Sequence, residues 1–160
     1  MPAGYYPKAG AGAKVMSLAD PMKKMSKSDE NQNGFILLMD KPEDIMRKFK
    51  RAVTDSDSHI VMDPENKPGV SNLIQIYSLA TGKTVSQVEA EFAGKGYGDF
   101  KPAVGEAVVE LLRPIREKTG DLLKNKDYLE QVYREGAQKA NHLARKTLDK
   151  LYRKVGFVAR

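Results

Sequence analysis

The sequence predicts a mostly α-helical protein, a helical bundle preceded by a mobile polar loop and one short strand. Apolar residues recur at helical spacing over most of the chain beyond residue 41. Proline and glycine stand near the ends of those stretches, where helices start and stop. A lysine- and serine-rich stretch at residues 22–33 has no apolar face, so we expect it to be a mobile surface loop.

Before the helices, the chain divides into two short segments. Residues 1–12 hold glycine and proline with almost no apolar periodicity, which predicts a loop or tail. Residues 13–40 carry the polar loop, and Gly34-Phe35-Ile36-Leu37-Leu38-Met39 is the one predicted strand. Residues 41–160 contain all the predicted helices.

The first predicted helix follows Asp40-Lys41-Pro42-Glu43. Asp40 is the expected N-cap, Pro42 the first-turn proline and Glu43 the capping-box partner. The apolar positions of this helix are Ile45, Met46, Phe49, Ala52 and Val53. Its basic residues Lys48, Lys50 and Arg51 are interpreted as a small solvated patch. A loop rich in Asp, Ser and Pro follows at residues 54–69.

Two further helices are expected between residues 71 and 92. Ser71 is the predicted cap of the first and Gly82 its stop. The apolar face of that helix is Leu73, Ile74, Tyr77 and Ala80. Thr84 and Gln87 predict a capping box for the second, ahead of apolar Val85, Val88 and Phe92.

The alternating glycines Gly94, Gly96 and Gly98 mark a turn before the two longest helices. They are not a phosphate loop, because neither a preceding strand nor a P-loop lysine is present. The next helix has the apolar stripe Val104, Ala107, Val108, Leu111, Leu112 and Ile115, with a bend expected at Pro114. Asp127 and Glu130 are the predicted caps of the last helix. Its apolar face is Leu129, Val132, Tyr133, Gly136, Ala137, Ala140, Ala144, Leu148, Leu151 and Val155.

Composition excludes several classes of protein. The chain has 160 residues, of which 41% are apolar and 30% charged, as in a globular domain with a real core. The absence of cysteine excludes disulfides, thiolate metal sites and thiol nucleophiles, and it agrees with a reducing cytoplasm. The longest run of large apolar residues, 35–39, is too short to span a membrane, and no signal peptide is expected. A net charge of +6 favours a polyanionic partner.

The stretch Lys24-Met25-Ser26-Lys27-Ser28 carries the clearest chemistry. It matches the KMSKS signature of class I aminoacyl-tRNA synthetases letter for letter. Lys24 and Lys27 could neutralise the charge that builds on pyrophosphate as it leaves ATP, and Ser26 and Ser28 could donate hydrogen bonds to phosphate oxygens. Met25 offers an apolar residue for docking the loop. The alternative is a solvated lysine–serine loop, since so short a match can arise by accident.

The surrounding sequence decides between these interpretations, because it resembles bacterial tryptophanyl-tRNA synthetases over nearly the whole chain. Tyrosyl-tRNA synthetases share the KMSKS loop in a related form but lack the helical-domain phrases, so the resemblance is to the tryptophanyl branch. The shared phrases are Gly12-Ala13-Lys14-Val15-Met16-Ser17-Leu18, Asp20-Pro21-Met22-Lys23, Ala52-Val53-Thr54-Asp55-Ser56, Lys67-Pro68-Gly69-Val70-Ser71-Asn72-Leu73, Gly94-Lys95-Gly96-Tyr97-Gly98, Leu112-Arg113-Pro114-Ile115 and Glu135-Gly136-Ala137-Gln138-Lys139-Ala140-Asn141.

The resemblance implies a set of ligands and roles. ATP is then a substrate, with Mg²⁺ bound mainly through it, and tryptophan and its tRNA are partners. Val15 should present backbone groups to the adenine, and Lys24 to Ser28 should close over the phosphates, with Lys24 and Lys27 catalytic. Residues 13–40 should belong to the catalytic domain and residues 41–160 to a helical domain on the anticodon side of the tRNA. The parent enzyme is expected to be a cytoplasmic homodimer.

One departure from the family pattern is equally informative. Class I synthetases need a second motif, HIGH or a close variant, but the two histidines, His59 and His142, are followed by Ile-Val-Met and Leu-Ala-Arg. The alternating strands and helices of a nucleotide-binding fold are also missing from the pattern. Most of the ATP site and of the tryptophan pocket is therefore expected on sequence outside this chain, which alone should be inactive.

Other candidate sites have competing interpretations. The basic residues of the last helix form either a surface that tracks tRNA phosphates or a solvated face; they are Lys139, Arg145, Lys146, Lys150, Arg153 and Lys154. His59 lies among Asp55, Asp57 and Asp63, but acidic loops are usually turns, so no metal site is expected. The tyrosines Tyr128, Tyr133 and Tyr152 are interpreted as core or rim residues and not as base-stacking platforms.

The sequence therefore predicts a C-terminal part of a tryptophanyl-tRNA synthetase. A rival of another class is a free-standing, non-catalytic RNA-binding helical module that kept a vestigial loop. A purely structural bundle is a second rival, but it leaves the intact Lys24 to Ser28 stretch unexplained.

Overall fold

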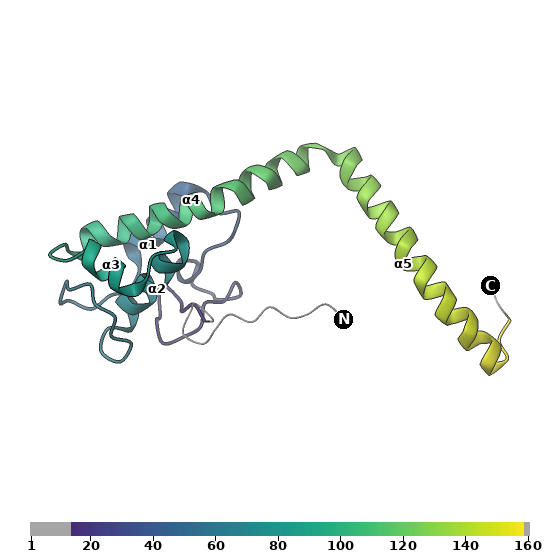
Figure 1. Cartoon of the computed structure of the whole chain (residues 1–160), viewed down its shortest axis with the longest axis horizontal. Coiled ribbons are helices and arrows are strands. Elements are labelled where there is room, and N and C mark those ends of the chain that lie inside the picture. Colours follow the sequence, from purple (N-terminus) through teal and green to yellow (C-terminus); the bar gives the residue numbers. More distant parts are fainter. Residues whose placement is uncertain (1–13, 159–160) are drawn as a thin grey trace. The chain divides into compact units, whose positions relative to one another are not determined.

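The computed structural model describes residues 14–158, so the predicted tail at residues 1–12 lies outside the described part. Helices dominate, as Figure 1 shows, and the prediction of a mostly helical fold is confirmed. The elements are the 3-10 helix η1 (Gln32–Gly34) and the α-helices α1 (Pro42–Arg51), α2 (Pro68–Thr81), α3 (Val85–Glu91), α4 (Tyr97–Lys124) and α5 (Lys126–Val155).

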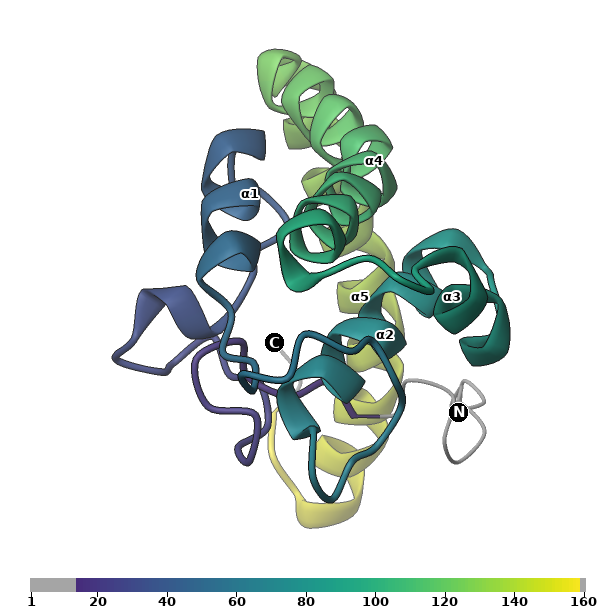
Figure 2. The same cartoon turned by 90° about the vertical axis from the view of Figure 1, so that its left-hand side faces the viewer.

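The chain forms two compact units, Met1–Arg116 and Glu117–Arg160, with the boundary inside α4. In the first unit, α1 and α3 lie on either side of the first part of α4 (Figure 2). One continuous apolar core joins these helices to α2. Its fully buried large side chains are Ile45, Phe49, Val70, Leu73, Ile74, Val88, Phe100 and Val104.

Three aromatic rings tie α2, α3 and α4 together. Phe100 of α4 lies 4.9 Å from the Phe92 ring, which follows α3, and 6.2 Å from the Tyr77 ring of α2, measured between centroids. Tyr77 and Phe92 are 5.4 Å apart. All three pairs meet edge to face, the arrangement that aromatic quadrupoles favour. On the other side, Gly105 lets α4 approach α1, because a Cβ there would lie 2.8 Å from the Met46 sulfur.

Several predicted helix ends are confirmed. Pro42 is in the first turn of α1. Gly82 ends α2 in the left-handed conformation, with a φ of 74°, which costs glycine little. The capping box at α3 is complete: the Thr84 N–H donates to Gln87 Oε1 at 2.9 Å, and the Gln87 N–H donates to Thr84 Oγ1 at 3.3 Å. These signals act within four residues, so sequence alone reveals them.

The predicted strand at residues 34–39 is wrong. Leu38 and Met39 form a turn, and within residues 14–158 the only β-type pairing is an isolated bridge elsewhere. Backbone groups of Phe35 and Leu37 bond to side chains, and those of Gly34 bond to Asn31 and Leu18, so the stretch forms no ladder with a neighbouring strand. Lys48 Nζ donates to the Phe35 carbonyl at 3.0 Å, and the Leu37 N–H donates to Asp40 Oδ2 at 3.0 Å. With its backbone satisfied in this way, the stretch has no need of a sheet.

The same contacts overturn two further expectations. Asp40 does not cap α1, whose N-cap position is Lys41 and carries no side-chain cap. The Asp40 carboxylate instead pairs with Lys48 at 2.6 Å. Lys48 is 7% exposed, so it belongs to the core edge and not to a solvated patch. Its ammonium group is satisfied by a carboxylate and a carbonyl, as a buried charge must be.

Two other predicted caps are also wrong. Ser71 lies inside α2, which begins earlier at Pro68, and its hydroxyl accepts a hydrogen bond from the Asp63 N–H at 2.9 Å. Asn125, and not Asp127 or Glu130, caps α5; its side chain accepts the N–H of the residue three positions later at 3.2 Å. At α5, Asn125 and Asp127 are both capping residue types, so the sequence pattern could not choose between them. At α2, the helix starts with Pro68 after Lys67, and no side chain caps it.

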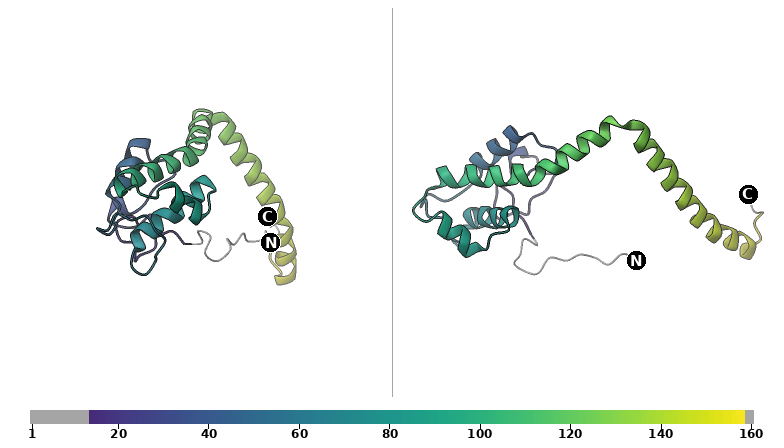
Figure 3. Two further views of the ribbon diagram at one scale, coloured as in Figure 1. Left: turned by 60° about the vertical axis from the view of Figure 1, so that its left-hand side comes forward. Right: turned by 45° about the horizontal axis from the view of Figure 1, so that its top comes forward.

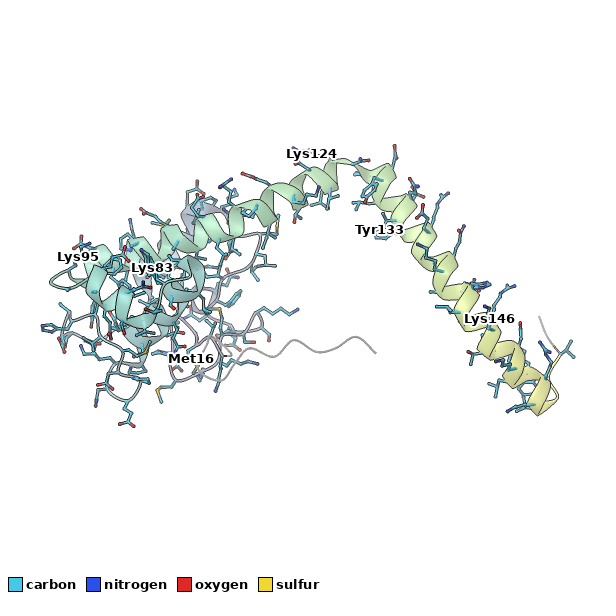
Figure 4. All side chains as sticks on the ribbon, in the orientation of Figure 1. Met16, Lys83, Lys95, Lys124, Tyr133 and Lys146 are labelled. Carbon is cyan, nitrogen blue, oxygen red and sulfur yellow. The ribbon has the colours of Figure 1, made fainter. Side chains whose placement is uncertain are left out.

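The second unit consists of the end of α4 and the whole of α5. The predicted last helix is present, and α5 is unbroken in both views of Figure 3. Within the described residues of α5, none is buried. Its side chains, including the labelled Tyr133 and Lys146, project outward from the helix (Figure 4). The predicted apolar face is therefore solvent-accessible in this chain, and Tyr133 is 68% exposed.

Candidate functional site

The first half of the candidate site is a small hairpin formed by residues 15–25. Met16 and Lys24 form an isolated antiparallel bridge. On either side of it, the Ser17 N–H donates to the Lys23 carbonyl at 2.8 Å, and the Met25 N–H donates to the Val15 carbonyl at 3.0 Å. This hairpin delivers the chain directly into the Lys24 to Ser28 stretch.

A buried serine organises the turn of the hairpin. Ser17 is 1% exposed, and its hydroxyl accepts the backbone N–H groups of Ala19 and Asp20, both at 3.3 Å. The Asp20 carboxylate accepts the Met22 N–H at 3.1 Å and pairs with Lys23. The hydrogen bond from Lys23 is the main reason that the pKa of Asp20 lies below its usual value. The turn thus has its own local scaffold.

The strand that enters the hairpin is fixed to the core. The Leu18 side chain is 2% exposed within the core cluster. Its N–H donates to the Gly34 carbonyl at 2.9 Å, and its carbonyl accepts the Val53 N–H at 2.8 Å. Gly34 allows this close approach because a Cβ there would lie 2.7 Å from the Ser17 hydroxyl. The base of the hairpin is therefore a fixed part of the first unit.

A second attachment comes from α2. The side-chain amide of Asn72 accepts the Met16 N–H through Oδ1 at 2.9 Å and donates through Nδ2 to the Met16 carbonyl at 2.9 Å. Asn72 is 4% exposed. Sequence reasoning missed this contact, because the two residues are 56 positions apart. The available signal was a polar residue placed directly before the apolar Leu73.

The five residues predicted to bind ATP phosphates lie where the hairpin ends. Lys24, Lys27 and Ser28 are exposed, whereas Met25 is half-buried and packs against the core. Met25 therefore attaches this end of the loop to the core of the first unit. The Ser26 and Ser28 hydroxyl oxygens lie 3.0 Å apart, so the two serines hydrogen-bond each other.

The charges of this stretch are open to a ligand. Lys23 is held by Asp20 at 3.1 Å. Within the part of the chain that the structure describes, Lys24 and Lys27 make no ion pair or side-chain hydrogen bond. An anion could therefore bind both ammonium groups without first breaking a contact. Val15, the predicted adenine contact, packs its side chain on the core and commits its carbonyl to Met25.

Three phrases of the family resemblance meet in one polar network beside the hairpin. Asp55 Oδ1 accepts the Tyr97 hydroxyl at 2.7 Å and lies 3.4 Å from Lys67 Nζ, which is 2.6 Å from Asp57. Burial first, and then the hydrogen bond to Asp55, raises the pKa of Tyr97 to about 12. Burial would raise the pKa of Asp55, but the hydrogen bonds from Tyr97 and its other donors outweigh it and lower that pKa.

The network braces the segment that holds the hairpin. Lys101 of α4 donates to the Ala52 carbonyl at 2.9 Å. Gly69 of α2 packs so closely on the Val53 carbonyl that no Cβ would fit there. Since Val53 also bonds to Leu18 of the hairpin, segments 52–55, 67–69 and 97–101 together support its base. The sequence pattern identified these phrases but not their contacts.

His59 lies beside an acidic residue on the loop after α1. Its ring Nδ1 contacts the Asp57 carboxylate, and that hydrogen bond raises the pKa of His59 above its usual value. Across residues 14–158, no three His, Cys, Asp or Glu side chains gather closely enough to hold a metal ion. In the same range, no helix is long and apolar enough to cross a membrane.

The predicted tRNA-binding residues lie in the second unit. Lys139, Arg145, Lys146 and Lys150 are all exposed on α5. Spacings of seven and four residues place Lys139, Lys146 and Lys150 on one face of the helix. Among the described residues, none of the four forms an ion pair. This face can thus offer unneutralised positive charge to a polyanion.

Comparison with known proteins identifies the class. The family model of class I tRNA synthetases for tryptophan and tyrosine, "tRNA synthetases class I (W and Y)", matches residues 3–113. The chain therefore belongs to this family of class I tRNA synthetases.

Within the family, the similarity is to tryptophan–tRNA ligases. The chain is 52% identical to that of Clostridium tetani over 147 residues, covering 92% of this chain and 43% of the relative. It is 51% identical to that of Clostridium perfringens over 160 residues, or all of this chain and 47% of the relative. A tryptophanyl-tRNA synthetase structure from Campylobacter jejuni, complexed with ADP and tryptophan, aligns with a TM-score of 0.72 at 27% identity, covering 90% of this chain and 44% of that one.

These alignments also show that this chain matches only part of each relative. The chain spans less than half the length of the curated relatives it matches. What those relatives bind and catalyse as whole proteins is therefore a matter for proposal here.

Proposed function

We propose that this chain supplies the KMSKS loop and the helical tRNA-binding region of a tryptophan–tRNA ligase, which activates tryptophan with ATP and transfers it to its tRNA. The observation that carries the proposal is the firmly anchored hairpin that presents two unpaired lysines, Lys24 and Lys27, in a chain of this family. The ADP and tryptophan bound by the Campylobacter jejuni relative are consistent with these substrates.

In the proposed activation step, a tryptophan carboxylate oxygen bonds to the α-phosphorus of ATP, and the bond to pyrophosphate breaks. Negative charge then builds on the leaving pyrophosphate. Lys24 and Lys27 would neutralise it, and Ser26 and Ser28 would exchange their mutual hydrogen bond for bonds to phosphate oxygens. Val15 would offer its backbone to the adenine. Mg²⁺ would arrive with ATP, and no residue of this chain is assigned to it.

The remaining proposals concern the rest of the chain. Residues 13–40 would belong to the catalytic domain, and residues 41–160 to a helical domain on the anticodon side of the tRNA. There, Lys139, Arg145, Lys146 and Lys150 would contact tRNA phosphates. The parent enzyme would be a homodimer in the cytoplasm.

We further propose that this chain alone does not activate tryptophan. Its sequence has no HIGH-type motif, since the residues after His59 and His142 do not fit one. Two lysines on a loop gain their catalytic value only when the rest of the site holds the substrates against them. The chain alone should therefore show no tryptophan-dependent exchange of pyrophosphate into ATP.

A chimera tests this function directly. The chain replaces its aligned counterpart in the Clostridium perfringens ligase, to which all 160 residues align. The chimera should exchange pyrophosphate into ATP when tryptophan is present. Lys27→Ala should lower that rate by about 100- to 1,000-fold, the usual effect of losing one transition-state contact, and should leave tryptophan binding nearly unchanged.

The matched control is Lys23→Ala, which removes a lysine from the same hairpin that is already paired with Asp20. Its rate should stay close to that of the parent chimera. An inactive chimera, or equal losses for Lys23→Ala and Lys27→Ala, would contradict the proposal. Tight tRNA binding by the chain alone together with an inactive chimera would instead favour the non-catalytic RNA-binding module.

A further inference from the structure

We infer that Asn72 is a positioning residue for amino-acid activation, because it fixes the strand opposite Lys24 and so aims the signature lysines. The inference rests on the proposed function for its catalytic consequence. It rests on the geometry of the hairpin alone for its structural part, so the two can be tested separately.

The hydrogen-bond pattern of the hairpin explains why Met16 needs a partner. The bonds from Ser17 to Lys23 and from Met25 to Val15 flank the Met16–Lys24 pair, which is therefore a non-hydrogen-bonded antiparallel pair. In such a pair the N–H and carbonyl of Met16 point away from the Lys24 strand. They would form an open edge, like that of a sheet without its next strand.

The Asn72 side chain occupies that edge in place of a third strand. One amide group supplies an acceptor for the Met16 N–H and a donor for the Met16 carbonyl, both at 2.9 Å. Hydroxyls and neutral imidazoles also carry a donor and an acceptor, but an amide places them on two neighbouring atoms of one planar group, so both bonds can form side by side. The pairing fixes the strand in position and also in rotation about its axis, which a single hydrogen bond would not do.

The Asn72 side chain has little freedom to move because its helix, α2, is part of the core. Asn72 is 4% exposed and lies on α2 between Val70, Leu73 and Ile74, each at most 1% exposed. A buried amide with both functions satisfied has little freedom to move. The hairpin is also held at Leu18, two residues further along, by Gly34 and Val53. Asn72 thus holds the backbone of Met16, the residue directly opposite Lys24.

A shift of the hairpin would lower the reaction rate, because the rate depends steeply on the position of the catalytic groups. A displacement of about 1 Å can cost about 100-fold in rate, because catalytic groups must meet developing charge in the right place. Without Asn72, the Met16 strand could shift or twist, and Lys24 would move with it through the bridge. Tryptophan itself should still bind, because most of its pocket is expected on sequence outside this chain.

The first test uses the chimera described above. Asn72→Ala should lower the pyrophosphate-exchange rate by about 10- to 100-fold, with the KM for tryptophan changed less than about twofold. Asn72→Asp, of the same shape, keeps the acceptor for the Met16 N–H but replaces the donor by a carboxylate oxygen that faces the Met16 carbonyl. It should therefore also lower the rate, even if Asn72→Ala fails to fold.

The matched control is Ser71→Ala in the same turn of α2. Ser71 is 3% exposed, and its hydroxyl accepts a partly buried hydrogen bond from the Asp63 N–H, so its loss also weakens α2. Its hydroxyl bonds to Asp63 and not to the hairpin backbone, so the exchange rate should stay close to that of the parent. A loss with Ser71→Ala as large as that with Asn72→Ala would reduce Asn72 to a general packing role and overturn the inference.

A double-mutant cycle separates positioning from stability. If Asn72 acts through Lys24, the lysine that the bridge positions, Asn72→Ala should lower the rate less than about threefold in a Lys24→Ala background, because the effects of coupled residues are non-additive. A merely structural residue would cost the same in both backgrounds. Equal losses would therefore refute the positioning role while leaving the proposed function intact.

A second measurement uses the 160-residue chain by itself, outside the chimera, and needs no catalysis. Hydrogen exchange of the Ser17 and Met25 amides reports on the cross-strand bonds of the hairpin. Asn72→Ala should speed both by about tenfold or more, and Ser71→Ala should not, because local opening sets amide exchange. Unchanged exchange would overturn the inference whether or not the chimera is active.

Discussion

At the scale of single residues, the chain places charge in two different ways. Around Asp55 the charges are paired and half-buried, and Lys67 and Tyr97 both direct a donor at the same carboxylate. At the hairpin, Lys24 and Lys27 are exposed and have no partner among residues 14–158. The first arrangement supports structure, and the second leaves charge available for a ligand.

The Asp55 network predicts acid sensitivity. The folded pKa of Asp55 lies below its usual value of 3.8. Its ionised form therefore adds stability above the unfolded pKa, and this contribution is lost as the pH falls through the folded pKa. Between about pH 5 and pH 3, the chain should lose free energy of unfolding, and Asp55→Asn should lose less of it than the parent chain.

Urea unfolding followed by circular dichroism at several pH values would measure this difference. Glu106→Gln is the control, because Glu106 is exposed on α4 and has no ion pair in the described residues. An Asp55→Asn chain with the same pH dependence as the parent would show that the network adds nothing to acid sensitivity.

At neutral pH, Tyr97→Phe should lower the free energy of unfolding by about 1–3 kcal/mol, since it leaves Asp55 short of a hydrogen-bond donor.

At the scale of elements, local signals in the sequence succeeded and distant ones did not. The Thr84–Gln87 capping box was predictable because both partners lie within one helical turn. Asp40 is also a capping residue type just before a helix, but its carboxylate forms an ion pair with Lys48 and does not cap α1. The hairpin residue Met16 and its partner Asn72 are 56 positions apart, so no periodicity could pair them.

The candidate site shows the same division. The chemistry of Lys24, Ser26, Lys27 and Ser28 could be predicted because the residue types themselves carry it. The means of holding them could not, since it depends on tertiary contacts of Leu18 and Asn72 that the sequence does not display.

The basic face of α5 leads to a prediction about this element. Changing Arg145, Lys146 and Lys150 together to glutamine in the chimera should weaken binding of the tRNA for tryptophan. The slope of log affinity against log salt should fall by about 2 to 3, because each phosphate contact contributes about 0.7 to 0.9. Tryptophan activation without tRNA should be largely unaffected.

A salt titration of tRNA binding would measure this slope. The control changes Lys41, Lys50 and Arg51 to glutamine, which removes the same net charge from exposed positions at α1. If both triple variants lower the slope equally, only overall charge matters. If the α5 variant leaves it unchanged, the face is merely solvated.

At the scale of the whole molecule, the two units bury their apolar residues very unequally. The first has a continuous core, whereas α5 has no buried residue in the described part. The exposed apolar side chains of the second unit include Leu123, Val132, Leu143, Leu148, Leu151 and Val155. Such an exposed apolar surface favours association.

We therefore expect the chain alone to self-associate as its concentration rises. Sedimentation equilibrium over a wide concentration range would reveal it, and Leu148→Glu with Leu151→Glu should shift the chain toward monomer. Both positions are about half exposed, so these changes should spare the helix. A parent chain that stays strictly monomeric at high concentration would contradict the expectation.

The burial of Lys48 has a practical consequence for labelling experiments. An amine-reactive reagent modifies lysines in proportion to their access to solvent, and Lys48 Nζ is held between Asp40 and the Phe35 carbonyl. It is thus an internal reference that stays unlabelled while the chain is folded. Changes in the labelling of Lys24 and Lys27 can then be attributed to ligand occupancy and not to unfolding, so a single mass spectrum reports on both.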